Sequence, residues 1–227
     1  MILILMKIGK NNFFNTNKET ELMMKKNILT LAIAAFLSIV STANAEVDAT
    51  KAEDFIKKTT AEGVEQIINA DVSQQEKDKR FYSLLNGALD MDFIGQFVLG
   101  RNWRTATPAQ RKDFINVYRD LNIATWSKRF NEFKGKNFVF KGTSPSNSKG
   151  QVFVNTVVPM DQGEPAKVLW RVREKNGQYK IVDIIIEGVS LAQASRSEYT
   201  AFIKNNKGGL DALIKDLNVK LKQQQAK

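Results

Sequence analysis

Four segments between residues 137 and 187 are rich in Val, Ile and Phe and are separated by short stretches of Pro, Gly, Ser and Asn. This pattern predicts an antiparallel meander of β-strands. The predicted strands are 137–143, 151–160, 166–174 and 178–187. Because Asn176-Gly177 is typical of a two-residue hairpin turn, we expect the last two strands to pair directly, with Lys175 opposite Gln178. This meander restricts the possible folds of the chain more than any other feature.

Counting back from this turn predicts the register of the hairpin and the face on which each side chain lies. The expected pairs are Val172 with Ile181, Trp170 with Asp183 and Val168 with Ile185, all on one face. The opposite face is expected to hold Leu169, Arg171, Val182 and Ile184. Both faces are then partly apolar, so helices or a ligand should cover more than one side of the sheet.

Amphipathic helical patterns precede and follow the strands. Before them the apolar spacing predicts helices over 49–69 and 74–89, a short apolar segment over 92–99, and a long helix from Pro108 to about Phe133. After them it predicts helices over 190–204 and 210–221. Thr107 and Gln110 form a capping box at the start of the long helix, whose rotated apolar stripe predicts contact with more than one neighbour. The order of helices, sheet and helices indicates the α+β class.

The first 45 residues have the pattern of a targeting segment. Lys25 and Lys26 precede an apolar run over 28–40 and a small-residue site at Ala43-Asn44-Ala45, which is typical of a secretory signal peptide. The apolar run is shorter than the roughly 20 residues that span a bilayer. We therefore interpret 1–23 as an extension from a mis-assigned start codon, 24–45 as a cleavable signal peptide, and 46–227 as a single domain.

Charge and composition narrow the chemistry of this domain. The whole chain has a formal net charge of +10, and removal of residues 1–45, which carry +3, leaves +7. Such an excess favours an acidic partner, and for an exported protein anionic lipid is a better candidate than nucleic acid. Cys and His are both absent, which excludes disulfides, thiol nucleophiles, imidazole bases and zinc sites with nitrogen or sulfur ligands. We predict no metal site, no cofactor and no catalytic residue.

Two stretches of the sequence are distinctive. They are Val98-Leu-Gly-Arg-Asn-Trp-Arg-Thr-Ala-Thr-Pro-Ala-Gln-Arg111 and Val182-Asp-Ile-Ile-Ile-Glu-Gly-Val-Ser-Leu191. With the signal peptide and the order of elements, they make the chain from Phe55 to Leu221 resemble the MlaC family, also called the toluene-tolerance auxiliary family. The resemblance implies a curved antiparallel sheet of about four strands, wrapped by helices around an apolar lipid cavity.

The resemblance also implies a function and a location. Members of this family are phospholipid-binding proteins of the periplasm that belong to the Mla lipid-transport system. Such a carrier would shuttle phospholipid between an outer-membrane lipoprotein complex and the substrate-receiving subunit of an inner-membrane ABC transporter, and so maintain outer-membrane lipid asymmetry. We expect a monomer with bound phospholipid as its cargo.

A physical argument favours the same function. A phospholipid with two chains has on the order of 30 methylenes, each worth about 0.8 kcal/mol on leaving water, so burying both chains is worth more than about 20 kcal/mol. A lipid therefore needs an apolar enclosure to cross an aqueous compartment. Two chains need about 800 Å³, which is within the usual range of ligand pockets.

The expected lining lies on the last two strands and at their junction with the next helix. These residues are Val168, Trp170, Val172, Ile181, Ile185, Val189 and Leu191. For each of them the alternative is ordinary core packing. The indole N–H of Trp170 needs a partner, for which a headgroup, water or Asp183 is available. Val189 is the strongest single candidate, because it lies where the family motif leaves the sheet.

Several charged residues allow alternative interpretations. Arg101, Arg104 and Arg111 suit contact with a headgroup phosphate, but they equally suit helix capping or a partner surface. Asp183 and Glu187 alternate onto one strand face, so a small periplasmic enzyme acting through this pair is one rival hypothesis. Structural pairing with Arg171 or Arg104 is the simpler interpretation of these carboxylates. An interaction adaptor with a filled core is another rival.

Overall fold

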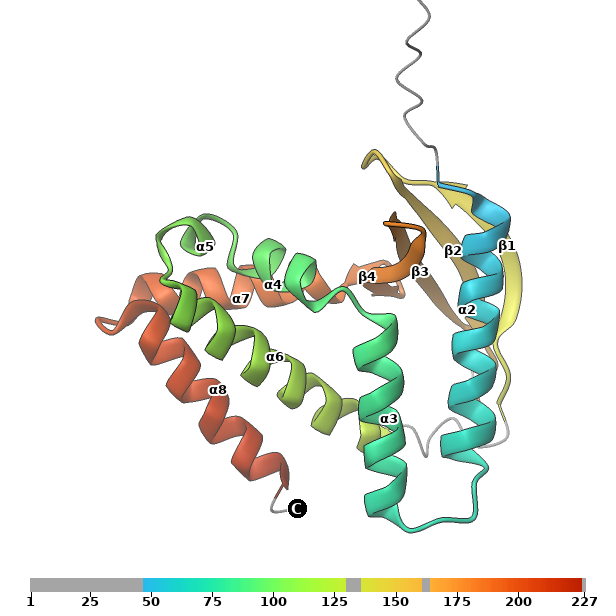
Figure 1. Cartoon of the computed structure of the whole chain (residues 1–227), viewed down its shortest axis with the longest axis horizontal. Coiled ribbons are helices and arrows are strands. Elements are labelled where there is room, and N and C mark those ends of the chain that lie inside the picture. The colour runs from blue at the N-terminus through green and yellow to red at the C-terminus, as the bar shows by residue number, and fades with distance from the viewer. Residues whose placement is uncertain (1–46, 130–135, 161–163, 226–227) are drawn as a thin grey trace, which may run out of the picture. The chain divides into compact units, whose positions relative to one another are not determined.

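The computed structural model describes residues 47–129, 136–160 and 164–225 (Figure 1). The predicted signal peptide and the extension before it lie outside the described residues. In chain order the elements are α2 (Ala49–Gly63), the π-helix η1 (Val64–Ile68), α3 (Gln74–Ala88), α4 (Met91–Leu99), α5 (Arg101–Thr105), α6 (Pro108–Arg129), β1 (Val139–Pro145), β2 (Gln151–Val158), β3 (Ala166–Lys175), β4 (Gln178–Ile186), β5 (Val189–Ser190), α7 (Leu191–Asn205) and α8 (Gly209–Gln225). This order of helices, antiparallel sheet and helices confirms the α+β class.

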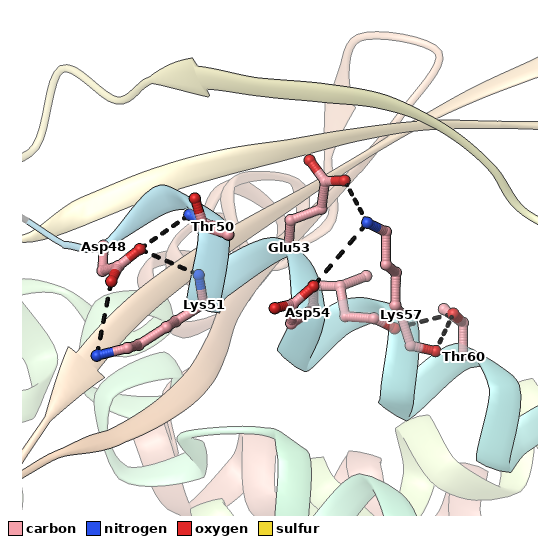
Figure 2. A network of polar contacts seen from close by, with 8 residues as sticks. Asp48, Thr50, Lys51, Glu53, Asp54, Lys57 and Thr60 are labelled. Atoms are coloured by element: carbon pink, nitrogen blue, oxygen red, sulfur yellow. Dashed lines mark hydrogen bonds and ion pairs between the residues drawn. The ribbon is translucent and has the colours of Figure 1, made fainter.

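Helix α2 begins at a side-chain cap and ends at a glycine. Asp48 Oδ1 accepts hydrogen bonds from the backbone N–H groups of Thr50 and Lys51 at 3.0 and 3.1 Å, and the bond from Lys51 lowers the pKa of Asp48 (Figure 2). Farther along, Lys57 pairs with two acidic residues of the preceding turn. The α-helix ends at Gly63, and the chain continues as the π-helical turn η1.

The start of α6 has the predicted capping box. The backbone N–H of Thr107 donates to Gln110 Oε1 at 3.0 Å, and the backbone N–H of Gln110 donates to Thr107 Oγ1 at 3.2 Å. Phe114 packs in a buried cluster with α4, α7 and α8, whereas Ile123 packs in another with η1 and α3. Contact with more than one neighbour is therefore confirmed. The predicted helix end near Phe133 lies outside the described residues.

The strands form one antiparallel sheet in the order β1-β2-β3-β4-β5, which confirms the predicted meander. Asn176 and Gly177 have φ values of 54° and 76°, as a two-residue hairpin turn of this type requires. Lys175 lies opposite Gln178, also as predicted. The short strand β5 is an addition to the four predicted strands.

The predicted register of the β3–β4 hairpin is correct at Val172 with Ile181 and wrong beyond that pair. Val182 is an extra residue in β4, which forms a β-bulge and shifts every later pair by one residue. The observed pairs are Arg171 with Asp183, Trp170 with Ile184, Leu169 with Ile185 and Val168 with Ile186. The bulge therefore moves Ile184 onto the face of Trp170, and it moves Ile185 to the opposite face.

The sheet face that carries Trp170 is covered in two parts. Helix α2 lies across one part, where Ile56 packs with Val154, Val172 and Ile181 in a fully buried cluster (Figure 1). Beside the other part, side chains of α3, α4, α6 and α7 line a cavity together with residues of β3 and β4.

Candidate functional site

An apolar cavity lies where the β3–β4 hairpin meets the helices. Its lining comprises Phe81 and Leu85 from α3; Leu89, Met91 and Ile94 at and in α4; Tyr118, Arg119, Asn122, Ile123 and Trp126 from α6; Phe138, Val168 and Trp170; Val182, Asp183, Ile184 and Ile186 from β4; and Leu191 and Ala192 from α7. Aliphatic and aromatic side chains predominate in this set. This lining favours the burial of apolar groups, and it contains few side chains that could act in catalysis.

The cavity is partly enclosed. The volume of the cavity is about 170 Å³. Two acyl chains need about 800 Å³, which is more than the cavity offers in this structure.

The bulge in β4 places Ile184 on the sheet side of the cavity. Trp170 and Ile184 form a cross-strand pair on this wall, and Phe138 meets the Trp170 ring edge-on with the ring centroids 5.5 Å apart. The indole N–H of Trp170 donates to Thr156 Oγ1 at 3.0 Å, so its partner is neither Asp183 nor a ligand. Thr156 Oγ1 in turn donates to the Val168 carbonyl at 2.8 Å. This polar pair lets a tryptophan stand at an apolar wall with its N–H satisfied.

The structure divides the predicted lining residues into three groups. Val168, Trp170 and Leu191 line the cavity. Val172 and Ile181 are instead fully buried in the core beneath α2. The other two residues do not face the cavity: Ile185 is turned away by the bulge, and the side chain of Val189 is 57% exposed. Val189 is exposed because the tight turn at Glu187 and Gly188, with φ values of 49° and 80°, carries the chain out to the sheet edge.

The lining predicted from the sequence did not include the cavity residues that the helices before the sheet contribute. The residues it missed are Phe81, Leu85, Leu89, Met91, Ile94, Tyr118, Ile123 and Trp126. One signal was available, because the apolar stripe of α6 rotates between Phe114 and Trp126 and so had to face two environments. Phe114 is in the helical core, and Trp126 is at the cavity.

Asp183 is the most deeply buried charged group at the cavity, with 4% of its surface exposed. Its Oδ2 accepts from Ser190 Oγ at 2.6 Å and lies 3.8 Å from Arg171 Nη2, and its Oδ1 accepts from the backbone N–H of Ala192 at 3.1 Å. The expected structural pairing with Arg171 is confirmed. Because its oxygens are occupied by the start of α7, Asp183 acts as an anchor between β4 and α7.

Glu187 is exposed at the turn after β4 and accepts a hydrogen bond from the backbone N–H of Lys167. Asp183 and Glu187 therefore have separate structural partners, and only Asp183 is buried. Within the described residues, no cluster of acidic side chains is placed to hold a metal ion.

The three arginines singled out in the sequence lie at the α4–α5–α6 corner and are not among the cavity-lining residues. Arg111 Nε donates to the Trp103 carbonyl at 3.0 Å, and its guanidinium stacks over the Trp103 ring at 5.1 Å. Arg111 thus caps the end of α5. Arg101 and Arg104 are exposed.

Raising the pH above about 10 is expected to destabilise the fold through two buried tyrosines. Burial raises the pKa of Tyr118 and of Tyr199 above their ordinary value of 10.0. Above the ordinary value the unfolded chain loses phenolic protons that the folded chain keeps, so the free energy of unfolding falls as the pH rises. Below it this contribution is fully present.

Tyr118→Phe removes one of these groups together with the hydrogen bond to Ser195. Urea denaturation at about pH 7 and about pH 11 should show a smaller alkaline loss for this variant than for the wild type. Tyr82→Phe is the matched control, since the Tyr82 side chain is 38% exposed and its replacement should leave the pH dependence unchanged. An alkaline loss in Tyr118→Phe equal to that of the wild type would contradict the assignment.

Comparison with known proteins agrees with this geometry. A model of the MlaC protein family matches residues 58–219. The intermembrane phospholipid transport system binding protein MlaC of Haemophilus influenzae is 22% identical over 195 residues, which cover 82% of this chain and 88% of that protein. The solved structure of a phospholipid-binding protein from Ralstonia solanacearum, in complex with a phospholipid, matches with a TM-score of 0.68 at 21% identity over 77% of this chain and 98% of that chain.

None of the described helices is long and apolar enough to cross a membrane.

Proposed function

Because the chain belongs to the MlaC family, we propose that it is a phospholipid-binding transport protein that encloses acyl chains in the cavity between the β3–β4 hairpin and the helices. The observation that carries the proposal is the cavity lining, in which apolar side chains from four helices and two strands converge around one space. Burial of the chains supplies the affinity, and no covalent step is needed.

The wider role in the proposal is a shuttle. The protein would reside in the periplasm after cleavage of the signal peptide at Ala45, and it would pass phospholipid between an outer-membrane lipoprotein complex and an inner-membrane ABC transporter. The net charge of +7 on residues 46–227 supports this role, since it attracts the domain toward anionic membranes and acidic partners. Such traffic would maintain the lipid asymmetry of the outer membrane.

Lipid extraction tests this proposal. The mature protein, purified from bacterial periplasm without detergent, should yield about one phospholipid per chain when the extract is analysed by mass spectrometry. Delipidated protein should rebind phospholipid presented from cyclodextrin. Purified protein that carries no phospholipid and rebinds none would overturn the proposal.

A further inference from the structure

The apolar cavity is smaller than its proposed cargo. Its volume is about 170 Å³, whereas two acyl chains need about 800 Å³. The proposed function therefore requires the walls of the cavity to separate. Each buried apolar side chain that becomes exposed during this separation costs free energy, so the walls should part where the fewest buried side chains lie between them.

The described residues contain three clusters of buried apolar side chains, and the smallest lies between α3 and α6. Ten buried residues join α4, α6, α7 and α8, and eight others join α2 to the sheet. The smallest cluster has three buried residues, which are Ile67 of η1, Phe81 of α3 and Ile123 of α6. Phe81 and Ile123 also line the cavity. Separation at this α3–α6 boundary therefore exposes fewer buried side chains than separation within either large cluster.

The two helices at the α3–α6 boundary are attached to different parts of the fold. Arg80 Nη1 of α3 donates to the Gln66 carbonyl of η1 at 3.0 Å, and Ala88 at the end of α3 is buried in the cluster beneath α2. In α6, Phe114 and Tyr118 are buried in the cluster with α4, α7 and α8. The boundary can therefore open while both large clusters stay intact.

Tyr82 and Arg119 contact each other across this boundary. The guanidinium carbon of Arg119 lies 5.4 Å from the centroid of the Tyr82 ring, which is a cation–π contact between α6 and α3. Arg119 also lines the cavity, and its hydrogen bond at 3.0 Å goes to Asp120, its neighbour on α6. Tyr82 is 38% exposed, and the Arg119 side chain is 20% exposed. Cation–π contacts at such partly exposed sites are weak, so this one can break and re-form as the helices move.

We propose that the Tyr82–Arg119 contact is a latch between α3 and α6, which is closed in this conformation and broken when both acyl chains are bound. This inference rests on the proposed carrier function. It adds that the free energy of opening the α3–α6 boundary is part of the affinity for lipid. Loss of the latch makes the open, binding-competent conformation more populated, and the apparent affinity rises in proportion.

Tyr82→Ala removes the ring that Arg119 contacts. Delipidated protein is titrated with a fluorescent phosphatidylethanolamine, and we expect the variant to bind it about threefold more tightly than the wild type does. Tyr82→Phe is the matched control, because Phe keeps the ring face and should keep the wild-type affinity. A purely structural role of Tyr82 would lower the affinity of the Ala variant or leave it unchanged.

A cross-link tests the opening itself. The chain has no Cys, so Tyr82→Cys/Arg119→Cys places a single pair of thiols across the α3–α6 boundary. Joining them with a short, cleavable bis-maleimide should weaken phospholipid binding at least about tenfold, and cleaving the linker should restore it. The control is Glu198→Cys/Lys220→Cys, an exposed ion pair at 3.7 Å that joins α7 to α8 within one cluster. Cross-linking this control pair should leave binding unchanged.

Two results would each overturn the latch and leave the carrier function standing. One is a Tyr82→Ala affinity equal to or weaker than that of the wild type. The other is phospholipid binding by the cross-linked Tyr82→Cys/Arg119→Cys protein that equals binding after the linker is cleaved. Wild-type protein that binds no phospholipid overturns the carrier function itself.

Discussion

Ile184→Glu is expected to weaken phospholipid binding at least about a hundredfold. Ile184 pairs with Trp170 on the sheet wall of the apolar cavity, so a carboxylate at this position would stand where the account places an acyl chain. The acyl chain would then lie next to a charged carboxylate in a poorly hydrated cavity. Most of the free energy gained by burying the acyl chain would be lost. Titration of delipidated protein with a fluorescent phospholipid measures the loss.

Val189→Glu is the matched control for this variant. It also replaces a β-branched apolar residue with Glu, five residues farther along the chain, but at a residue that is 57% exposed and outside the cavity lining. We expect its binding to equal that of the wild type. The account is contradicted if Val189→Glu abolishes binding or if Ile184→Glu, shown by circular dichroism to be folded, leaves binding intact.

Asp183→Ala is expected to lower the free energy of unfolding by about 3 kcal/mol or more. The substitution leaves Arg171 without its partner, and it removes the acceptor for Ser190 Oγ and for the Ala192 backbone N–H at the start of α7. In the wild type, all three groups interact with the Asp183 carboxylate, and this residue is only 4% exposed. Urea denaturation followed by circular dichroism measures the change.

The other carboxylate of the motif supplies the comparison for Asp183→Ala. Glu187 is exposed, and its side chain accepts a hydrogen bond from the Lys167 backbone N–H, while its own backbone N–H donates to the Lys167 carbonyl and would do so in the variant, so Glu187→Ala should cost less than about 1 kcal/mol. Asp183→Asn should fall between the two, because the amide keeps one acceptor oxygen. Similar losses for Asp183→Ala and Glu187→Ala would show that Asp183 is not the anchor between β4 and α7.

Short sequence motifs correctly predicted the turn and the helix start that depend only on residues close together in the sequence. The Asn176-Gly177 turn needs two residues that accept positive φ, and the capping box at Thr107 and Gln110 is closed by residues three apart. Both appear in the structure as predicted. The order of the strands followed, because consecutive strands joined by short turns pair with each other.

The register beyond the bulge could not be read from the hairpin itself. The extra residue Val182 places Asp183 where it meets Ser190 and Ala192, so the bulge depends on a contact with α7 that the strand sequence does not contain. The same error carried Ile185 into the predicted lining and left Ile184 out. Contacts with α7 therefore determine which residues of β4 line the cavity, and strand alternation alone predicted them wrongly.

The three tryptophans of the chain allow the position of the bound acyl chains to be measured directly. Trp126 and Trp170 line the apolar cavity, whereas Trp103 lies in α5 against Arg111 and outside it. A phospholipid with brominated acyl chains quenches tryptophan fluorescence on contact. In Trp103→Phe protein, bound brominated lipid should quench most of the emission, and in the double variant Trp126→Phe/Trp170→Phe it should leave the Trp103 emission unchanged. Quenching of Trp103 with no quenching of the two cavity tryptophans would contradict the account.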